Sequence, residues 1–193
     1  LDALRAVARS ERVLVVVAPD DALWPAADGA DRAEVGPCGG ASRAASVFNG
    51  LSALRERGVP DHDWVLVHDA ARCLVTPQEI DALIDACQDD PVGGLLGLPL
   101  PDTLKAEAGG RVEQTIDRAH KWLAQTPQMF RLGALHAALR SAQPQGFAGI
   151  TDEASAMEGL GLRPRLVEAR ASNNKVPYPH DFALAEAILR SRT

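Results

Sequence analysis

The residues best suited to chemistry follow a short apolar run near the middle of the sequence. Trp64–His68 is rich in β-branched and apolar residues, and it is followed at once by Asp69 and, three residues later, by Arg72. In an open α/β sheet, ligands bind at the carboxyl ends of the strands. An aspartate at that edge can hold a divalent cation, and an arginine can hold a phosphate. The pairing therefore favours nucleotide chemistry, and a turn-forming aspartate is the alternative.

A glycine-rich turn is the second candidate. Gly40 and Ala41 end a run of small residues that leads into a helix predicted over 42–57, and Ser46 falls in the first turns of that helix. Backbone N–H groups at such a helix start can hold a base or a phosphate. Two glycines before a helix are a weak signal, and a tight connection explains them equally well.

Alternating strands and helices are predicted to position these residues. Apolar β-branched runs predict strands, and apolar residues at helical spacing predict helices. The strands are expected at 13–18, 64–68 and 92–98, and the helices at 42–57, 77–87, 132–141, 151–160 and 180–190. This alternation predicts an α/β fold with a doubly wound, mostly parallel sheet, in a single domain over residues 1–193.

Residues 101–126 interrupt the alternation. Three short strand patterns, at 102–105, 111–117 and 121–125, lie around a turn at Gly109–Gly110. They predict a protruding β-arm, and an isolated hairpin is marginally stable in water. We therefore expect the arm to contact a second subunit in a homodimer. Thr103 and Arg118 fall within it, and taken alone they are ordinary surface residues, as is Lys175 further along.

Composition excludes several classes of protein. The net charge of −6 argues against sequence-independent binding of nucleic acid, which needs a basic surface. The three cysteines have no CxxC spacing, which argues against a zinc site or a disulfide framework and favours a cytoplasmic location. The longest apolar stretch, 92–100, is too short to span a membrane. The chain begins with Leu1 and a helix-like pattern over 1–9, so we expect its natural start to lie upstream.

Read together, seven segments resemble one family. They are GGASRAASVFNGL, VLVHDAARCLV, LPDTLKA, TIDR, LAQTPQMF, ITDEASAMEGLG and NNKV. Their order and spacing, from about Gly39 to the C-terminus, resemble those of the 2-C-methyl-D-erythritol 4-phosphate cytidylyltransferases. The resemblance implies a Rossmann-like nucleotidyltransferase fold and the transfer of CMP from CTP to methylerythritol phosphate, with release of pyrophosphate, in isoprenoid precursor synthesis.

The resemblance also implies a role for individual residues. Asp69, Arg118 and Lys175 would be catalytic, and Asp69 would also hold Mg²⁺ or another divalent cation. Arg72 and Thr103 would bind methylerythritol phosphate, and Thr103 and Arg118 would come from the arm of the other subunit. The nucleotide would be bound by Gly40, Ala41 and Ser46.

The sequence departs from the family pattern in three places. Cys73 stands where a proline is usual, and Lys175 is followed by VPYP where the family usually has a threonine after the valine. The family's N-terminal glycine-rich phosphate loop, with its arginine and lysine, is absent from the sequence as given, and we expect it to precede Leu1. Two alternatives remain: a ribitol 5-phosphate cytidylyltransferase, or a non-catalytic nucleotide-binding module if the loop is truly missing.

Overall fold

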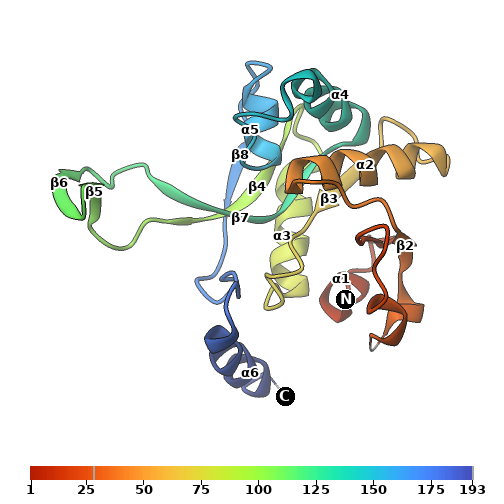
Figure 1. Ribbon diagram of the computed structural model, residues 1–193, viewed down its shortest axis with the longest axis horizontal. Coiled ribbons are helices and arrows are strands. Elements are labelled where there is room, and N and C mark those ends of the chain that lie inside the picture. The colour runs from red at the N-terminus through yellow and green to blue at the C-terminus, as the bar shows by residue number, and fades with distance from the viewer. Residues whose placement is uncertain (28, 193) are drawn as a thin grey trace.

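The computed structural model describes residues 1–27 and 29–192. It is an α/β structure in which helices cover a central sheet and a hairpin projects to one side (Figure 1). The strands are β1 (Leu14–Val16), β2 (Glu34–Gly36), β3 (Trp64–Val67), β4 (Gly93–Pro99), β5 (Leu104–Ala108), β6 (Arg111–Ile116), β7 (Trp122–Arg131) and β8 (Arg165–Glu168). The α-helices are α1 (Asp2–Arg5), α2 (Arg43–Glu56), α3 (Pro77–Cys87), α4 (Leu132–Ala142), α5 (Glu153–Glu158) and α6 (Phe182–Arg190).

The main sheet has the strand order β3-β7-β4-β8. Strand β7 is antiparallel to both β3 and β4, and β8 is parallel to β4. Strands β3, β4 and β8 therefore run in one direction, and β7 alone opposes them. Strands β1 and β2 form a separate parallel pair. These directions confirm the prediction of a mixed, mostly parallel sheet.

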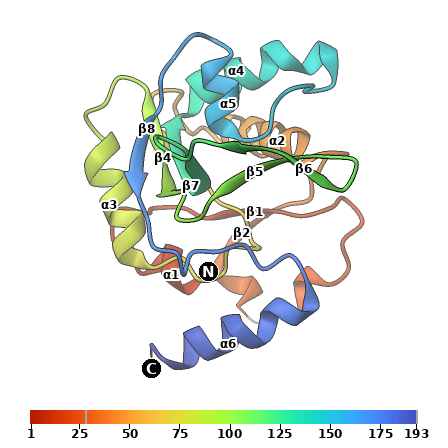
Figure 2. The ribbon, with the colours of Figure 1, turned by 90° about the vertical axis from the view of Figure 1, so that its left-hand side faces the viewer.

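Successive residues of the strands face opposite sides of the sheet, and each side is covered by its own helices. Val65, Leu95 and Phe130 pack against α2, α4 and α5 in one apolar cluster. Their chain neighbours Leu96 and Met129 pack against α3 and the segment around α1 in a second cluster. The result is the three-layered, doubly wound arrangement that the alternation of elements predicts (Figures 1 and 2).

The predicted helix bounds agree best with the structure where the sequence contains capping residues. Helix α3 spans 77–87 as predicted, because Thr76 and Glu79 form a capping box and Pro77 occupies the first helical position. The prediction over 1–9 is wrong beyond the first turn, because α1 ends at Arg5 and begins without a side-chain cap. The prediction over 151–160 is also too long, because Asp152 is the N-cap and α5 ends at Glu158.

The predicted third strand of the arm is wrong as a separate element. Residues 122–125 belong to β7, which returns from the β5–β6 hairpin and continues through the main sheet to Arg131. Pro127 made this continuation hard to predict, because proline cannot donate a ladder hydrogen bond. Here the register of the β4–β7 ladder shifts between Leu95 and Gly97, so Pro127 sits opposite an irregularity. The missing N–H of Pro127 therefore removes no regular hydrogen bond from the β4–β7 ladder.

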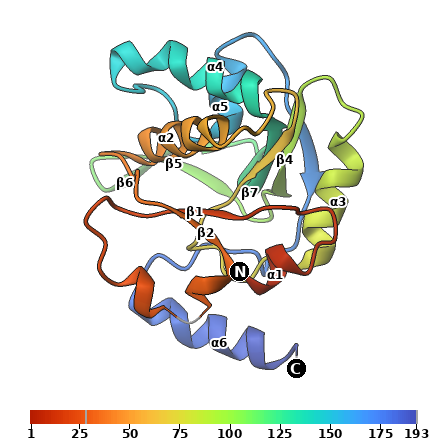
Figure 3. The same ribbon diagram turned by 90° about the vertical axis from the view of Figure 1, so that its right-hand side faces the viewer.

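A large cavity of about 1640 Å³ separates β1 from β3. In the described part of the chain β1 pairs only with β2, and β3 only with β7, so one edge of each faces this cavity. The views turned about the vertical axis show β1 and β2 lying between α2 and α6 (Figures 2 and 3). The cavity is apolar along the strands and has charged residues at both ends: Arg43, Asp69 and Arg72 line it near the carboxyl ends, and Arg12 and Asp63 line it near the amino ends. No helix among residues 1–27 and 29–192 is long and apolar enough to span a membrane.

Candidate active site

Asp69 lies just beyond the carboxyl end of β3 and contacts two cations from distant parts of the chain. Its Oδ1 accepts a hydrogen bond from Nε of Arg43 at 2.7 Å, and its Oδ2 accepts one from Nζ of Lys175 at 3.2 Å. The Asp69 side chain is 14% exposed, and that of Lys175 is 49% exposed. Burial opposes ionisation of Asp69, but the two cations together hold the pKa of its carboxyl below the ordinary value.

Arg43, the first residue of α2, joins Asp69 to a buried carboxylate. Its Nη1 and Nη2 donate to Oε1 and Oε2 of Glu153 at 2.7 and 3.0 Å. Burial raises the pKa of Glu153, and the paired guanidinium offsets part of that rise. Burial likewise opposes the charge of Arg43, but the two carboxylates raise its pKa overall. One guanidinium therefore bridges both acids.

The irregular part of β7 holds the backbone of Asp69 in place. The Asp69 N–H donates to Oγ1 of Thr126 at 3.0 Å, and the same oxygen lies 3.1 Å from Nδ1 of His68. The other ring nitrogen of His68 lies 3.1 Å from the Arg72 carbonyl. Burial lowers the pKa of His68. Both ring nitrogens are therefore engaged in fixing the turn.

The segment that carries Lys175 is anchored by its buried neighbour Asn173. The Asn173 amide donates to Oε1 of Gln125 and to the carbonyl of Thr126, both at 2.9 Å. Nη1 of Arg72 donates to the Asn173 carbonyl at 2.8 Å. Arg72 thereby ties the turn after β3 to the Lys175 segment, and its buried Nε has no hydrogen-bond partner among the described residues.

The glycine turn lies beside the carboxyl end of β1, and Ser46 next to it lines the large cavity. Gly39 N–H donates to the Val17 carbonyl at 2.8 Å, and Gly40 N–H donates to Oγ of Ser46 at 2.9 Å. A Cβ on Gly40 would lie 2.6 Å from Cβ of Ala45, so the helix requires a glycine there. Ala41 precedes the N-cap Ser42. Because the Gly40 N–H is already bonded, a nucleotide could not use it as a donor.

The two predicted residues of the arm lie apart from this cluster. Thr103 comes just before β5, and Arg118 follows β6 and donates to the carbonyl of Pro101. No hydrogen bond or ion pair within residues 1–27 and 29–192 joins either residue to Asp69. A single chain therefore brings together Asp69, Arg72 and Lys175 beside the turn of Gly40, Ala41 and Ser46, but it leaves Thr103 and Arg118 outside.

Sequence reasoning missed Arg43 and Glu153. Arg43 carried one usable signal, because a cation in the first turn of a helix opposes the helix dipole and therefore needs another explanation. Glu153 gave none, since an acid at a helix start is ordinary. Its near-complete burial, with 2% of the side chain exposed, is visible only in the fold.

A divalent cation fits this site only with ligands from a substrate. The part of the chain that the structure describes contains no cluster of three or more His, Cys, Asp or Glu residues able to hold a metal. Asp69 offers one carboxylate, which contacts the cations Arg43 and Lys175. Mg²⁺ in nucleotide sites is commonly held by one or two carboxylates, phosphate oxygens and water, so the donor set is compatible with that mode.

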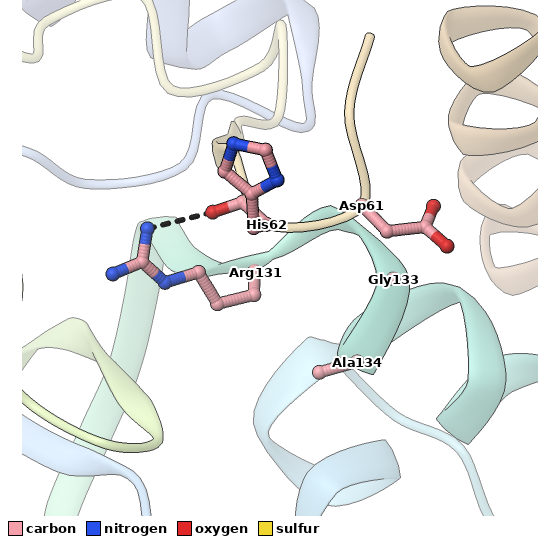
Figure 4. A pocket seen from close by; sticks show the side chains of 5 residues that line it. All are labelled: Asp61, His62, Arg131, Gly133 and Ala134. Carbon is pink, nitrogen blue, oxygen red and sulfur yellow. Dashed lines mark hydrogen bonds between the residues drawn. The ribbon is translucent and has the colours of Figure 1, made fainter.

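A second cavity, of about 710 Å³, lies at the other end of β3 and is lined by Asp61, His62, Arg131, Gly133 and Ala134. Figure 4 shows Arg131 donating to the His62 carbonyl there, at 2.7 Å. The lining residues surround the amino end of β3, whereas ligands of open α/β sheets bind at carboxyl ends. The cavity beside Asp69 is therefore the better candidate.

The chain is similar to named proteins along nearly all of its length. The profile of the family described as IspD, 2-C-methyl-D-erythritol 4-phosphate cytidylyltransferase, matches residues 1–191. A bifunctional enzyme IspD/IspF of Albidiferax ferrireducens is 60% identical over 194 residues, covering 100% of this chain and 46% of the relative. A 2-C-methyl-D-erythritol 4-phosphate cytidylyltransferase of Burkholderia multivorans is 53% identical over 192 residues, covering 98% of this chain and 81% of the relative.

Solved structures agree with these relatives. The crystal structure of a 4-diphosphocytidyl-2C-methyl-D-erythritol synthase matches with a TM-score of 0.87 and 38% identity, covering 97% of this chain and 86% of the other. That of the 2-C-methyl-D-erythritol 4-phosphate cytidylyltransferase from Thermus thermophilus matches with a TM-score of 0.82 and 33% identity, with the same two coverages. The chain belongs to the family of 2-C-methyl-D-erythritol 4-phosphate cytidylyltransferases, nucleotidyltransferases that make 4-diphosphocytidyl-2-C-methyl-D-erythritol from CTP and methylerythritol phosphate.

Proposed function

We propose that this protein transfers CMP from CTP to methylerythritol phosphate at the carboxyl edge formed by β1 and β3. The observation that carries the proposal is the single carboxylate of Asp69, held between Arg43 and Lys175 where the large cavity meets the carboxyl end of β3. A carboxylate flanked by cations can orient hydroxyl groups while the cations stabilise phosphate charge. The family membership supplies the identity of both substrates.

The reaction requires positioning and charge stabilisation more than covalent chemistry. A phosphate oxygen of methylerythritol phosphate attacks the α-phosphorus of CTP in line, the new P–O bond forms, and pyrophosphate leaves with the electrons of the broken bond. Lys175 is half exposed and can turn from Asp69 towards phosphate oxygens. Asp69 would accept hydrogen bonds from substrate hydroxyls, and the guanidinium of Arg72, which lines the cavity, would attract the substrate phosphate.

A divalent cation, Mg²⁺ by our proposal, would be held by Asp69 together with the triphosphate. When bound, it would neutralise part of the phosphate charge. The nucleotide would lie against the turn of Gly40, Ala41 and Ser46, which packs closely on Ala45 of α2 because Gly40 has no side chain. The N–H of Gly40 is bonded to Ser46, so this turn would contact the base through carbonyl groups and its surface.

The arm suggests how the charge of the site is completed. Arg43, Arg72 and Lys175 carry three positive charges beside the negative charges of Asp69 and Glu153, which leaves a small excess for two highly anionic substrates. We propose that the protein is a homodimer in which Thr103 and Arg118 of one subunit's arm reach the methylerythritol phosphate of the other. The projecting β5–β6 hairpin supports this arrangement, because little of its own chain covers it (Figure 1).

We also propose that the protein works in the cytoplasm. Cys38, Cys73 and Cys87 are all free thiols, and a reducing compartment keeps thiols in that state. Burial raises the pKa of Cys87 to about 11, so this thiol stays protonated and inert at neutral pH.

A pyrophosphate-release assay on the full-length protein tests the activity. CTP, Mg²⁺ and methylerythritol phosphate should release pyrophosphate in step with formation of 4-diphosphocytidyl-2-C-methyl-D-erythritol, measured by chromatography. Ribitol 5-phosphate in place of methylerythritol phosphate, and each substrate alone, are the controls. Turnover that is faster with ribitol 5-phosphate, or release that does not depend on either acceptor, would contradict the proposal.

A further inference from the structure

We infer that Glu153 is a positioning residue that fixes the Asp69 carboxylate through Arg43. The inference rests on the proposed function, because Asp69 is placed at the reacting phosphates there. Glu153 would touch neither substrate, since its two oxygens both face the guanidinium of Arg43. Its effect on the reaction would pass through one side chain.

The geometry of the guanidinium makes such transmission direct. Nη1 and Nη2 of Arg43 are both bound by Glu153, at 2.7 and 3.0 Å, and the Nε–H that remains points to Oδ1 of Asp69 at 2.7 Å. A guanidinium is planar and rigid, so two bonds along one edge fix the direction of the third N–H. Oδ1 of Asp69 is therefore assigned to Arg43, and Oδ2 is left to face Lys175.

Glu153 is itself held by the strand that supports Asp69. It is the first residue of α5, where Gln128 on β7 accepts from the N–H of Ala154 at 2.8 Å and donates to Oδ2 of Asp152 at 2.9 Å. Two residues earlier on β7, Thr126 accepts from the Asp69 N–H. Both ends of the connection from Glu153 to Asp69 are thus attached to the same short stretch of β7.

Packing alone gives a poor account of this pair. A carboxylate buried to 2% exposure carries a large desolvation penalty, and apolar residues of similar size are often as stabilising as a buried ion pair. Arg43 also opposes the dipole of α2 at its first residue. These costs are explained if the pair sets the direction of the Asp69 carboxylate.

A double-mutant cycle tests the inference on the full-length protein. The variants are Glu153→Gln, Arg43→Gln and the double variant, with kcat and KM from pyrophosphate release and stability from urea unfolding. We expect each single change to lower kcat on the order of a hundredfold, with KM changed much less, because misplacement of a reacting group lowers kcat. The double variant should lose no more than the worse single variant, because both remove the same connection.

Two further variants separate positioning from a purely structural role. Arg43→Lys keeps the charge but lacks the planar fork whose two bonds to Glu153 fix the direction of the third N–H, so it should lose as much kcat as Glu153→Gln. It serves in place of that variant if Glu153→Gln does not fold. Asp61→Asn is the matched control: it breaks the two-bond pair of Asp61 with Arg55 at the other end of β3, and kcat should be unchanged.

The outcomes are distinct. An active wild type with additive losses in the double variant, or a fully active Arg43→Lys, would overturn the inference and leave the proposed function standing. The inference would also be overturned if the loss of kcat in each variant were proportional to its loss of stability and Asp61→Asn lost as much kcat as the others. A wild-type protein that releases no pyrophosphate would contradict the proposed function and, with it, any part of Glu153 in that reaction.

Discussion

The carboxylate of Asp69 is shared between two cations that differ in mobility. Arg43 is anchored by Glu153 in a largely buried pair, whereas Lys175 is half exposed and lies 3.2 Å from its oxygen. The Lys175 end of this pair is half exposed to water, which screens the interaction, so Lys175 can leave Asp69 at a cost on the order of 1 kcal/mol. By the proposed reaction, Arg43 keeps the carboxylate in place while Lys175 follows the phosphates.

Substitution of Lys175 should therefore affect activity far more than folding. We expect Lys175→Met to lower kcat/KM on the order of a hundredfold, because a positioned cation near transferring phosphates is lost. The free energy of unfolding should change by less than about 1 kcal/mol. Pyrophosphate release and urea unfolding measure the two effects.

Arg190→Met is the control for Lys175→Met, because Arg190 forms an exposed ion pair with Glu186 on α6, outside the candidate site. This variant should retain its activity. A large loss of stability in Lys175→Met, or unchanged turnover, would contradict the role proposed for Lys175.

At the scale of elements, the packing of α2 against α4 includes a histidine that is held neutral. The ring of His136 on α4 stacks on Phe48 of α2 with centroids 4.8 Å apart. Its Nε2 lies 3.1 Å from Oγ of Ser52, and its Nδ1 lies 3.3 Å from Nη1 of Arg55. Burial, and then the neighbouring Arg55 and Arg140, lower the pKa of His136. The charged form is therefore disfavoured in the folded protein.

This packing predicts a loss of stability in acid. Above about pH 6.5 the His136 ring is neutral in both the folded and the unfolded protein, so its lowered pKa does not affect stability. Below that pH the unfolded chain takes up a proton that the folded protein resists, until the pH reaches the lowered pKa of the folded state. Stability should fall across this window. In urea unfolding, the free energy of unfolding of His136→Gln should fall less between pH 7.5 and 5.5 than that of the wild type. His68 contributes similarly to both proteins, so its effect cancels when the two are compared. Parallel pH profiles would refute the assignment.

At the scale of the whole molecule, the candidate site is assembled from segments that are far apart in the chain. Residues around 40, 69, 126, 153 and 175 meet at one edge of the sheet, whereas Thr103 and Arg118 are carried away from it on the hairpin (Figure 1). If the proposed homodimer is correct, each complete site takes Asp69 from one subunit and Arg118 from the other.

Complementation between inactive variants tests the shared site. Asp69→Ala and Arg118→Ala should each be inactive alone, and mixing them should restore activity, because one site of each heterodimer has both wild-type residues. With random mixing, about a quarter of all sites recover. Asp69→Ala mixed with Lys175→Ala should recover nothing, because these two residues meet within one chain. No recovery in the first mixture, with heterodimers confirmed by mass spectrometry, would argue against a shared site.

Local sequence signals predict the elements whose formation depends on residues close together in the chain. The capping box and Pro77 fix α3, the β-branched run fixes β3, and the alternation of strands and helices fixes the doubly wound class. Asp69 and Arg72 are predicted from their place after the strand pattern and Lys175 from the resemblance to a family, and the fold places them together. Each of these predictions depends on residues that are close together in the sequence or on a motif of consecutive residues.

Only the tertiary structure decided the course of β7 and the connection of Arg43 to Glu153. Pro127 reads as a break, and the strand continues because the bulge in its ladder with β4 leaves that position without a regular pair. Glu153 reads as an ordinary acid at a helix start, and it differs because folding buries it against a guanidinium 110 residues away. The physical reason is the same in both cases: burial and pairing between distant segments depend on three-dimensional contacts, and the local sequence alone carries no record of them.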